Sequence, residues 1–199
     1  ATWWSSSSDV RRMTRLFVAL WPPDEVREEL RQLHRKDQRG VRFVPEDNWH
    51  VTLRFLGEAD VDEVAAALDT VRFEPAVARL GPAVDVLHER ALVVPVGGSD
   101  ELAAAVAEAM HNIVEPARKR FHGHLTVARV KPNVPMPRVL GATVHAEWAV
   151  AEVALVQSRL DPAGARYTTL ATWPVPPPGA TPRLRPGLRP GPGARAGSP

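Results

Sequence analysis

An α+β fold built on antiparallel sheets is predicted for this chain of 199 residues by two features of its sequence. Short apolar runs typical of strands alternate with segments in which apolar residues recur every three or four positions, as they do in helices. Several of the strands follow one another with only a turn between them, which favours antiparallel pairing over a doubly wound parallel sheet. The chain is long enough for one compact domain or for two small lobes that share a core.

The elements are expected in a definite order along the chain. Strands are predicted over 15–21, 41–44, 50–56, 83–87, 91–96, 122–130, 152–160 and 166–172, and helices from 24, over 61–71 and from 100 to 113. Asp24 is expected to cap the first helix, and Gly57 is expected to end the third strand. The run Gly97-Gly98-Ser99 lacks the lysine of a phosphate-binding loop, so we interpret it as the exit of a hairpin.

Composition excludes several classes of protein. The chain has no cysteine, which rules out disulfides, a thiolate nucleophile, cysteine-ligated zinc and iron–sulfur clusters. No apolar run approaches the ~20 residues of a membrane span, and nothing near the start reads as a secretory signal. We therefore expect a soluble cytoplasmic protein with no membrane contact.

Both ends of the chain differ in composition from the middle. Residues 1–12 are predicted to be a disordered extension, with Met13 a candidate for the natural start, and residues 174–199 a disordered tail rich in Pro, Gly and Arg. The tail holds four arginines and no acidic residue, so the remaining chain has 21 basic against 23 acidic side chains. A body this close to neutrality does not predict an extended duplex-binding surface. The folded domain is expected over 13–173.

Two segments, 74 residues apart, repeat one pattern: His50-Val51-Thr52 and His124-Leu125-Thr126, each at the start of an apolar strand. Side chains alternate between the faces of a strand, so each motif should present an imidazole and a hydroxyl on the same face. His122 has the same parity as His124 and is a candidate third imidazole. The other face is expected to anchor the strands in the core through Val51, Leu53, Phe55, Leu125 and Val127.

Two imidazoles and two hydroxyls suit acid–base chemistry on a phosphodiester. The reference pKa of histidine is about 6.5, so one ring can accept a proton from water while the other donates one to a leaving oxygen. The hydroxyls can bind phosphate oxygens without a metal ion. A zinc site is less favoured because no His-Glu-x-x-His spacing occurs, and a serine-hydrolase triad because no Gly-x-Ser-x-Gly turn occurs. A single histidine on a strand would more often be structural.

The paired motifs and their flanks resemble those of the 2H phosphoesterases, and within them the bacterial and archaeal RNA 2′,3′-cyclic phosphodiesterases, historically called 2′-5′ RNA ligases. The likeness extends in order over 13–173 and is carried by 15–20 (RLFVAL), 44–57 (VPEDNWHVTLRFLG), 124–129 (HLTVAR), 156–158 and 164–167. His122-Gly123 departs from the family pattern, in which a proline commonly precedes the second motif. The resemblance implies a bilobal α+β fold with pseudo-two-fold symmetry and one motif from each lobe in a central groove.

The resemblance also implies site residues and a reaction, hydrolysis of a 2′,3′-cyclic phosphate to a 2′-phosphomonoester without cofactor or metal. His50 would donate a proton to the departing 3′ oxygen, and His124 would accept one from water. The phosphate would be held by Thr52, Thr126 and Arg129. By alternation Arg129 falls on the face opposite His124, so a strand end or a bulge must redirect it.

Phe17, on the first strand, is a candidate for stacking on a base, with a core position as the alternative. The expected partners are RNA ends bearing a 2′,3′-cyclic phosphate or small cyclic nucleotides, bound by a monomer. Two other functions stay open. One is a module that binds a nucleotide or RNA end without turnover, and the other is ligation by the reverse reaction, since a catalyst accelerates both directions.

Overall fold

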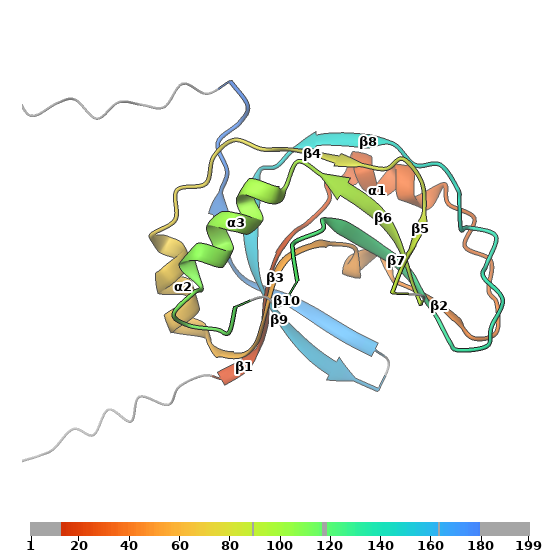
Figure 1. The fold of residues 1–199 in the computed structure, drawn as a ribbon, viewed down its shortest axis with the longest axis horizontal. Helices are drawn as coiled ribbons and strands as arrows, with labels where there is room; N and C mark the ends of the chain where they lie inside the picture. The colour runs from red at the N-terminus through yellow and green to blue at the C-terminus, as the bar shows by residue number, and fades with distance from the viewer. Residues whose placement is uncertain (1–12, 89, 117–118, 163, 180–199) are drawn as a thin grey trace, which may run out of the picture.

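The computed structural model describes residues 13–179 with the exception of 89, 117–118 and 163, so the predictions for 1–12 and 180–199 lie outside the described residues. The elements, in chain order, are β1 (Met13–Leu20), α1 (Asp24–Arg31), β2 (Val41–Phe43), a 3-10 turn (Glu46–Asn48), β3 (Val51–Asp60), α2 (Val61–Asp69), β4 (Val77–Leu80), β5 (Asp85–Leu87), β6 (Ala91–Gly97), α3 (Asp100–Ala109), β7 (His124–Val130), β8 (Ala146–Ala149), β9 (Glu152–Asp161) and β10 (Gly164–Pro174). Figure 1 shows their arrangement.

The strands form one twisted sheet in the order β10-β9-β1-β3-β7-β6-β4-β8, with β2 added to β7 and β5 added to β6. Every pairing among the described strands is antiparallel. The predicted α+β fold with antiparallel sheets is therefore confirmed. Among the same residues, no helix combines the length and the apolar character that crossing a bilayer requires.

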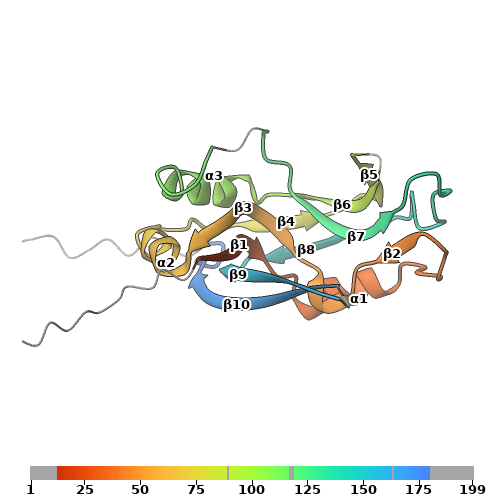
Figure 2. The ribbon, with the colours of Figure 1, turned by 90° about the horizontal axis from the view of Figure 1, so that it is seen from below.

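The sheet consists of two lobes that meet at its centre, between β3 and β7. The lobes are not the two halves of the chain, because β9 and β10 return to pair beside β1, in the lobe of the first motif. Helices α2 and α3 lie together at one end, where both contact β3, while α1 packs against β8 (Figures 1 and 2).

Strand β1 is buried on both faces, which explains its unbroken apolar run. Leu16, Val18 and Leu20 belong to the main core that the two lobes share. Phe17 and Ala19 point to the opposite face, where they form a small second core with β9 residues Ala154 and Val156, against which Trp21 and Tyr167 pack. This second core supports the floor of the site described below.

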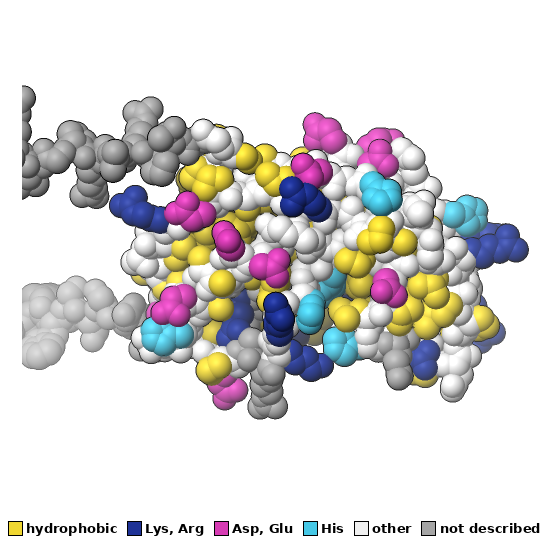
Figure 3. Space-filling view, turned by 45° about the horizontal axis from the view of Figure 1, so that its top comes forward, with side chains coloured by type: hydrophobic (Ala, Val, Ile, Leu, Met, Phe, Trp, Pro, Cys, Tyr) yellow, Lys and Arg dark blue, Asp and Glu magenta, His cyan; other side chains and the backbone are white. Residues whose placement is uncertain are grey.

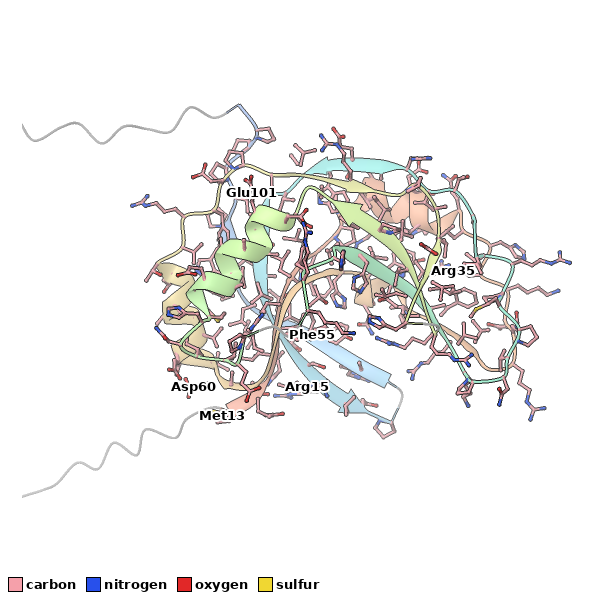
Figure 4. All side chains as sticks on the ribbon, viewed as in Figure 1. Met13, Arg15, Arg35, Phe55, Asp60 and Glu101 are labelled. Atoms are coloured by element: carbon pink, nitrogen blue, oxygen red, sulfur yellow. The ribbon has the colours of Figure 1, made fainter. Side chains whose placement is uncertain are left out.

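Strand β3 carries two β-bulges that change which side chains reach the core. The register against β1 shifts between Gly57 and Phe55 and again between Arg54 and Thr52, so that Leu56 and Leu53 are extra residues. Gly57, with φ of +71°, lies within the strand instead of ending it. The bulges also overturn the expectation for Phe55, which is 68% exposed on the face of Phe17 and Thr52 (Figure 4).

Several element boundaries differ from those predicted. Asp24 is the first helical residue of α1 and not its cap, which is Pro23, a residue in extended conformation without a side-chain capping hydrogen bond. The segment Gly97-Gly98-Ser99 leads out of the β5–β6 hairpin into α3, as the hairpin-exit interpretation predicts. The sequence did not predict β4 and β8, because strands of four residues are too short to show a clear alternation of apolar and polar side chains. Val175, in the predicted tail, is buried in the core, so the folded part extends past residue 173.

Candidate active site

The two His-x-Thr motifs meet at the centre of the sheet, where β3 and β7 pair through Val51 and Leu125. Both of these residues are fully buried and fix the strands to the core. One step to either side, the antiparallel register sets His50 opposite Thr126 and Thr52 opposite His124. Each imidazole thus faces the hydroxyl of the other motif across a local two-fold axis.

One cavity of about 210 Å³ is lined by both motifs. Its lining comprises His50, Thr52, His124, Thr126, Arg129, Arg42, Phe43, Val44, Pro45, Asn48, Phe55, Ala165 and Tyr167. No carboxylate occurs among these lining residues, whereas two arginines and two histidines do. The composition favours an anion. On the face shown in Figure 3, histidine side chains lie beside Lys and Arg side chains near a hollow.

The two imidazoles are held in the same way. Nδ1 of His50 donates to the carbonyl oxygen of Asn48 at 2.7 Å, and Nδ1 of His124 donates to the carbonyl oxygen of His122 at 2.8 Å. A carbonyl oxygen can only accept, so each Nδ1 carries a proton and each Nε2 is left for the cavity. His122 contributes its backbone to the site, and its own side chain lines the larger neighbouring cavity, not this one.

The surroundings of the two rings differ. His50 lies among three aromatic rings, with centroid distances of 5.0 Å to Phe17, 5.8 Å to Trp21 and 5.1 Å to Tyr167. Burial lowers the pKa of His50 from its ordinary value of 6.5, and the charges of His124 and Arg129 act in the same direction, against the hydrogen bond to Asn48. His50 is therefore held toward its neutral form in the free site.

Arg129 reaches the cavity because of a bulge in β7. The register against β6 pairs Val93 with Thr126 and Leu92 with Ala128, which leaves Val127 as an extra residue. Val127 and Ala128 are both buried, so alternation is reset and Arg129 emerges on the face of Thr126. The bulge expected from the sequence is thus present and turns Arg129 to the face of the motifs. Binding of phosphate by Arg129 stays a prediction.

Phe17 is not placed to stack on a base. Its side chain is 2% exposed and packs beneath His50 and Tyr167, so the core interpretation holds and the stacking interpretation is wrong. The reason is that side chains of the neighbouring strands, Val156 of β9, Phe55 of β3 and Tyr167 of β10, pack around Phe17 on that face of the sheet.

Eight of the thirteen lining residues were not predicted as site residues, among them Arg42, Phe55 and Tyr167. Phe55 and Tyr167 both have rings next to Phe17, at 6.0 and 5.0 Å between centroids. Phe55 appears in the sequence as an ordinary core position, and only the bulges in β3 reveal it. Arg42 lies directly opposite Arg129 in the pairing of β2 with β7, a long-range register with no local signal.

This fold, with one His-x-Thr motif from each lobe at a shared cavity, is that of the 2H phosphoesterases. Comparison with known proteins agrees. The sequence profile described as LigT-like phosphoesterase matches residues 20–81. A Thermus thermophilus protein named RNA 2′,3′-cyclic phosphodiesterase is 33% identical over 178 residues, which cover 78% of this chain and 87% of that protein. An Archaeoglobus fulgidus protein of the same name is 32% identical over 174 residues, covering 80% and 99%.

The structural comparison gives the same answer. The crystal structure of E. coli LigT in complex with 3′-AMP matches with a TM-score of 0.67 at 27% identity, over 82% of this chain and 98% of that one. The chain belongs to the LigT-like phosphoesterase family.

Proposed function

We propose that the protein hydrolyses 2′,3′-cyclic phosphates, on RNA ends or on small nucleotides, to 2′-phosphomonoesters without a metal ion. The observation that carries this proposal is a single small cavity into which two anchored imidazoles each present Nε2. Two hydroxyls and Arg129 complete the lining, and the relatives named RNA 2′,3′-cyclic phosphodiesterase support the choice of substrate.

In the proposed reaction a water oxygen bonds to phosphorus while the bond from phosphorus to the 3′ oxygen breaks. His124 takes a proton from the water at Nε2, and His50 gives a proton from Nε2 to the departing oxygen. Thr52, Thr126 and Arg129 hold the non-bridging oxygens, on which negative charge increases in the transition state. Exchange with solvent then returns the histidines to their starting forms.

The donor role of His50 requires that its ring gain a proton when substrate binds. In the free site burial lowers the pKa of His50, which favours the neutral ring. A bound phosphodiester places a negative charge beside that ring and favours the protonated form. We therefore expect substrate and proton to bind to the His50 side of the site together.

The nucleoside has an aromatic partner in Phe55. Its ring is 68% exposed and lines both the cavity of the motifs and a larger cavity beside it. Base stacking on an aromatic ring is typically worth ~1–3 kcal/mol. Replacement of Phe55 by Ala should therefore raise the KM for adenosine 2′,3′-cyclic phosphate by about tenfold, as initial-rate kinetics would show.

The proposal is tested with adenosine 2′,3′-cyclic phosphate in the presence of a chelator. The wild-type protein should form the 2′-phosphate at least 10²-fold faster than the double variant His50→Ala, His124→Ala. A protein that is stabilised against heat by the nucleotide yet gives no product would be a binding module, and the proposal would then be wrong. Loss of wild-type activity in chelator would contradict the metal-free step.

A further inference from the structure

The cavity of the motifs contains more positive charge than one cyclic phosphate needs. A cyclic phosphodiester carries a single negative charge, which Arg129 alone balances. Arg42 lines the same cavity, and no carboxylate lies among the lining residues that the structure describes. Arg42 also lies directly opposite Arg129 in the β2–β7 pairing, so two guanidinium groups on neighbouring strands line the same cavity.

The chain positions Arg42 from outside the two motif strands. Arg42 lies on β2, a short strand that pairs with the second half of β7, whereas β3 pairs with β7 near its start, at Leu125. Its guanidinium packs against Gly164, where a side chain would overlap one of its terminal nitrogens. Gly164 has φ of +133°, a conformation that suits glycine, and it begins β10.

The start of β10 is itself tied to the first motif. The side-chain amide of Asn48 donates to the carbonyl oxygen of Ala165 at 2.9 Å, two residues before His50 in the chain. Arg42, Ala165 and Asn48 all line the cavity, so the arginine belongs to a built wall and not to a loose surface. The wall holds a cation near the reacting phosphate while leaving the motif residues to do the chemistry.

We propose that Arg42 binds the phosphodiester that precedes the cyclic phosphate in an RNA chain, and so makes the site favour RNA ends over mononucleotides. This inference rests on the proposed function. A dinucleotide ending in a cyclic phosphate carries two negative charges and a cyclic mononucleotide carries one, so only the longer substrate can use the additional cation. A planar guanidinium also matches the two oxygens of a phosphate better than an ammonium does.

The test compares adenosine 2′,3′-cyclic phosphate with the dinucleotide ApA ending in a 2′,3′-cyclic phosphate. Arg42→Ala should lower kcat/KM about tenfold more for the dinucleotide than for the mononucleotide, mainly through KM. Arg42→Lys should retain part of the preference. For the dinucleotide, the slope of log kcat/KM against log salt concentration should fall by ~0.7, as expected when one contact to single-stranded phosphate is lost.

Two controls separate binding of this phosphate from other roles. Replacing the linkage of the dinucleotide by an uncharged methylphosphonate should abolish the additional loss in Arg42→Ala. The matched variant Arg159→Ala, an exposed arginine of β9 that does not line the cavity, should not alter the preference between the two substrates.

Three results would overturn the inference. Equal losses on both substrates would assign Arg42 to the reacting phosphate, and no loss on either would leave it without a part in binding. If Arg42→Ala and Arg42→Lys lower the melting temperature equally and lose activity equally, then Arg42 acts only through its packing against Gly164 and not by binding phosphate. Failure of the wild-type protein to turn over either substrate would contradict the proposed function instead, and is distinguished by that absence of any rate.

Discussion

His50 and His124 have the same local frame and different surroundings. Each ring is held through Nδ1 by the carbonyl oxygen two residues before it, at 2.7 and 2.8 Å. His50 is enclosed by Phe17, Trp21 and Tyr167, whereas His124 also borders the larger cavity beside α3. The backbone anchor leaves Nε2 of each ring without a backbone partner, and burial in addition lowers the pKa of His50.

The difference arises from the lobes that supply the two strands. The first motif lies beside β1, and β9 and β10 continue the sheet on the other side of β1, so aromatic side chains gather around His50. The second motif lies on β7, beside β6. Strands β3 and β7 pair only through Val51 and Leu125 and then diverge, and a cavity of about 1060 Å³ lies next to His124. One pattern in the sequence therefore produces two environments.

The largest expected effect comes from removing either ring. His50→Ala and His124→Ala should each lower kcat by about 10²–10⁴, the usual contribution of one general acid or base. The double variant should have a kcat only slightly below that of the less active single variant, because the effects of two groups that act in one step are not additive. Steady-state rates on adenosine 2′,3′-cyclic phosphate would show this. A single variant with an undiminished kcat would remove that ring from the reaction.

The hydroxyls should give a smaller loss and one that is alike in both motifs. Thr52 and Thr126 lie opposite the imidazoles of the other strand, so Thr52→Val and Thr126→Val should each lower kcat/KM by about 10–100-fold, through lost hydrogen bonds to phosphate oxygens. The same substitution at Thr168, an exposed residue of β10, serves as the control. A loss at only one of the two motifs would show that the phosphate does not sit on the local axis.

Opening the aromatic surroundings of His50 should shift a pH profile more than it changes a rate. Burial lowers the pKa of His50, so Tyr167→Leu, which admits water, should raise that pKa and move the alkaline limb of kcat/KM to higher pH. Tyr167→Phe keeps the ring and should leave the limb in place. An unmoved limb in Tyr167→Leu would mean that another group controls it.

The smallest effect is on stability. Because the folded state lowers the pKa of His50, the stability that its neutral ring contributes is complete above pH ~6.5 and is lost as the pH falls through the folded value. Between pH 7 and 5, His50→Gln should therefore lose less unfolding free energy than the wild-type protein, as urea denaturation would measure. A greater loss in the variant would contradict the direction of the shift.

Much of the site could be predicted because its signals are local. Each His-x-Thr triplet needs only the alternation of a strand to place its imidazole and hydroxyl together, and both triplets lie where that alternation holds. The α+β class also follows from local periodicity. That the two motif strands would meet at one site was predicted only from the resemblance to the 2H phosphoesterases, and not from a pattern in the residues themselves.

What could not be predicted depends on register between distant strands. The bulges that expose Phe55 and turn Arg129 toward the cavity occur where β3 meets β1 and where β7 meets β6. The burial of Phe17 depends on β9, which follows it by more than a hundred residues. Arg42 reaches the site because β2 pairs with β7. None of these pairings between distant strands can be predicted from the local sequence pattern of either strand.

The central claim is that the two rings divide the proton transfers, with His50 as donor. It is tested most directly by bis(4-nitrophenyl) phosphate, whose leaving oxygen needs no proton. On this diester His50→Ala should approach the wild-type rate while His124→Ala stays impaired, although both variants are impaired on adenosine 2′,3′-cyclic phosphate. Recovery of His124→Ala in place of His50→Ala would reverse the assignment, and equal impairment of both on the activated diester would contradict the division of roles.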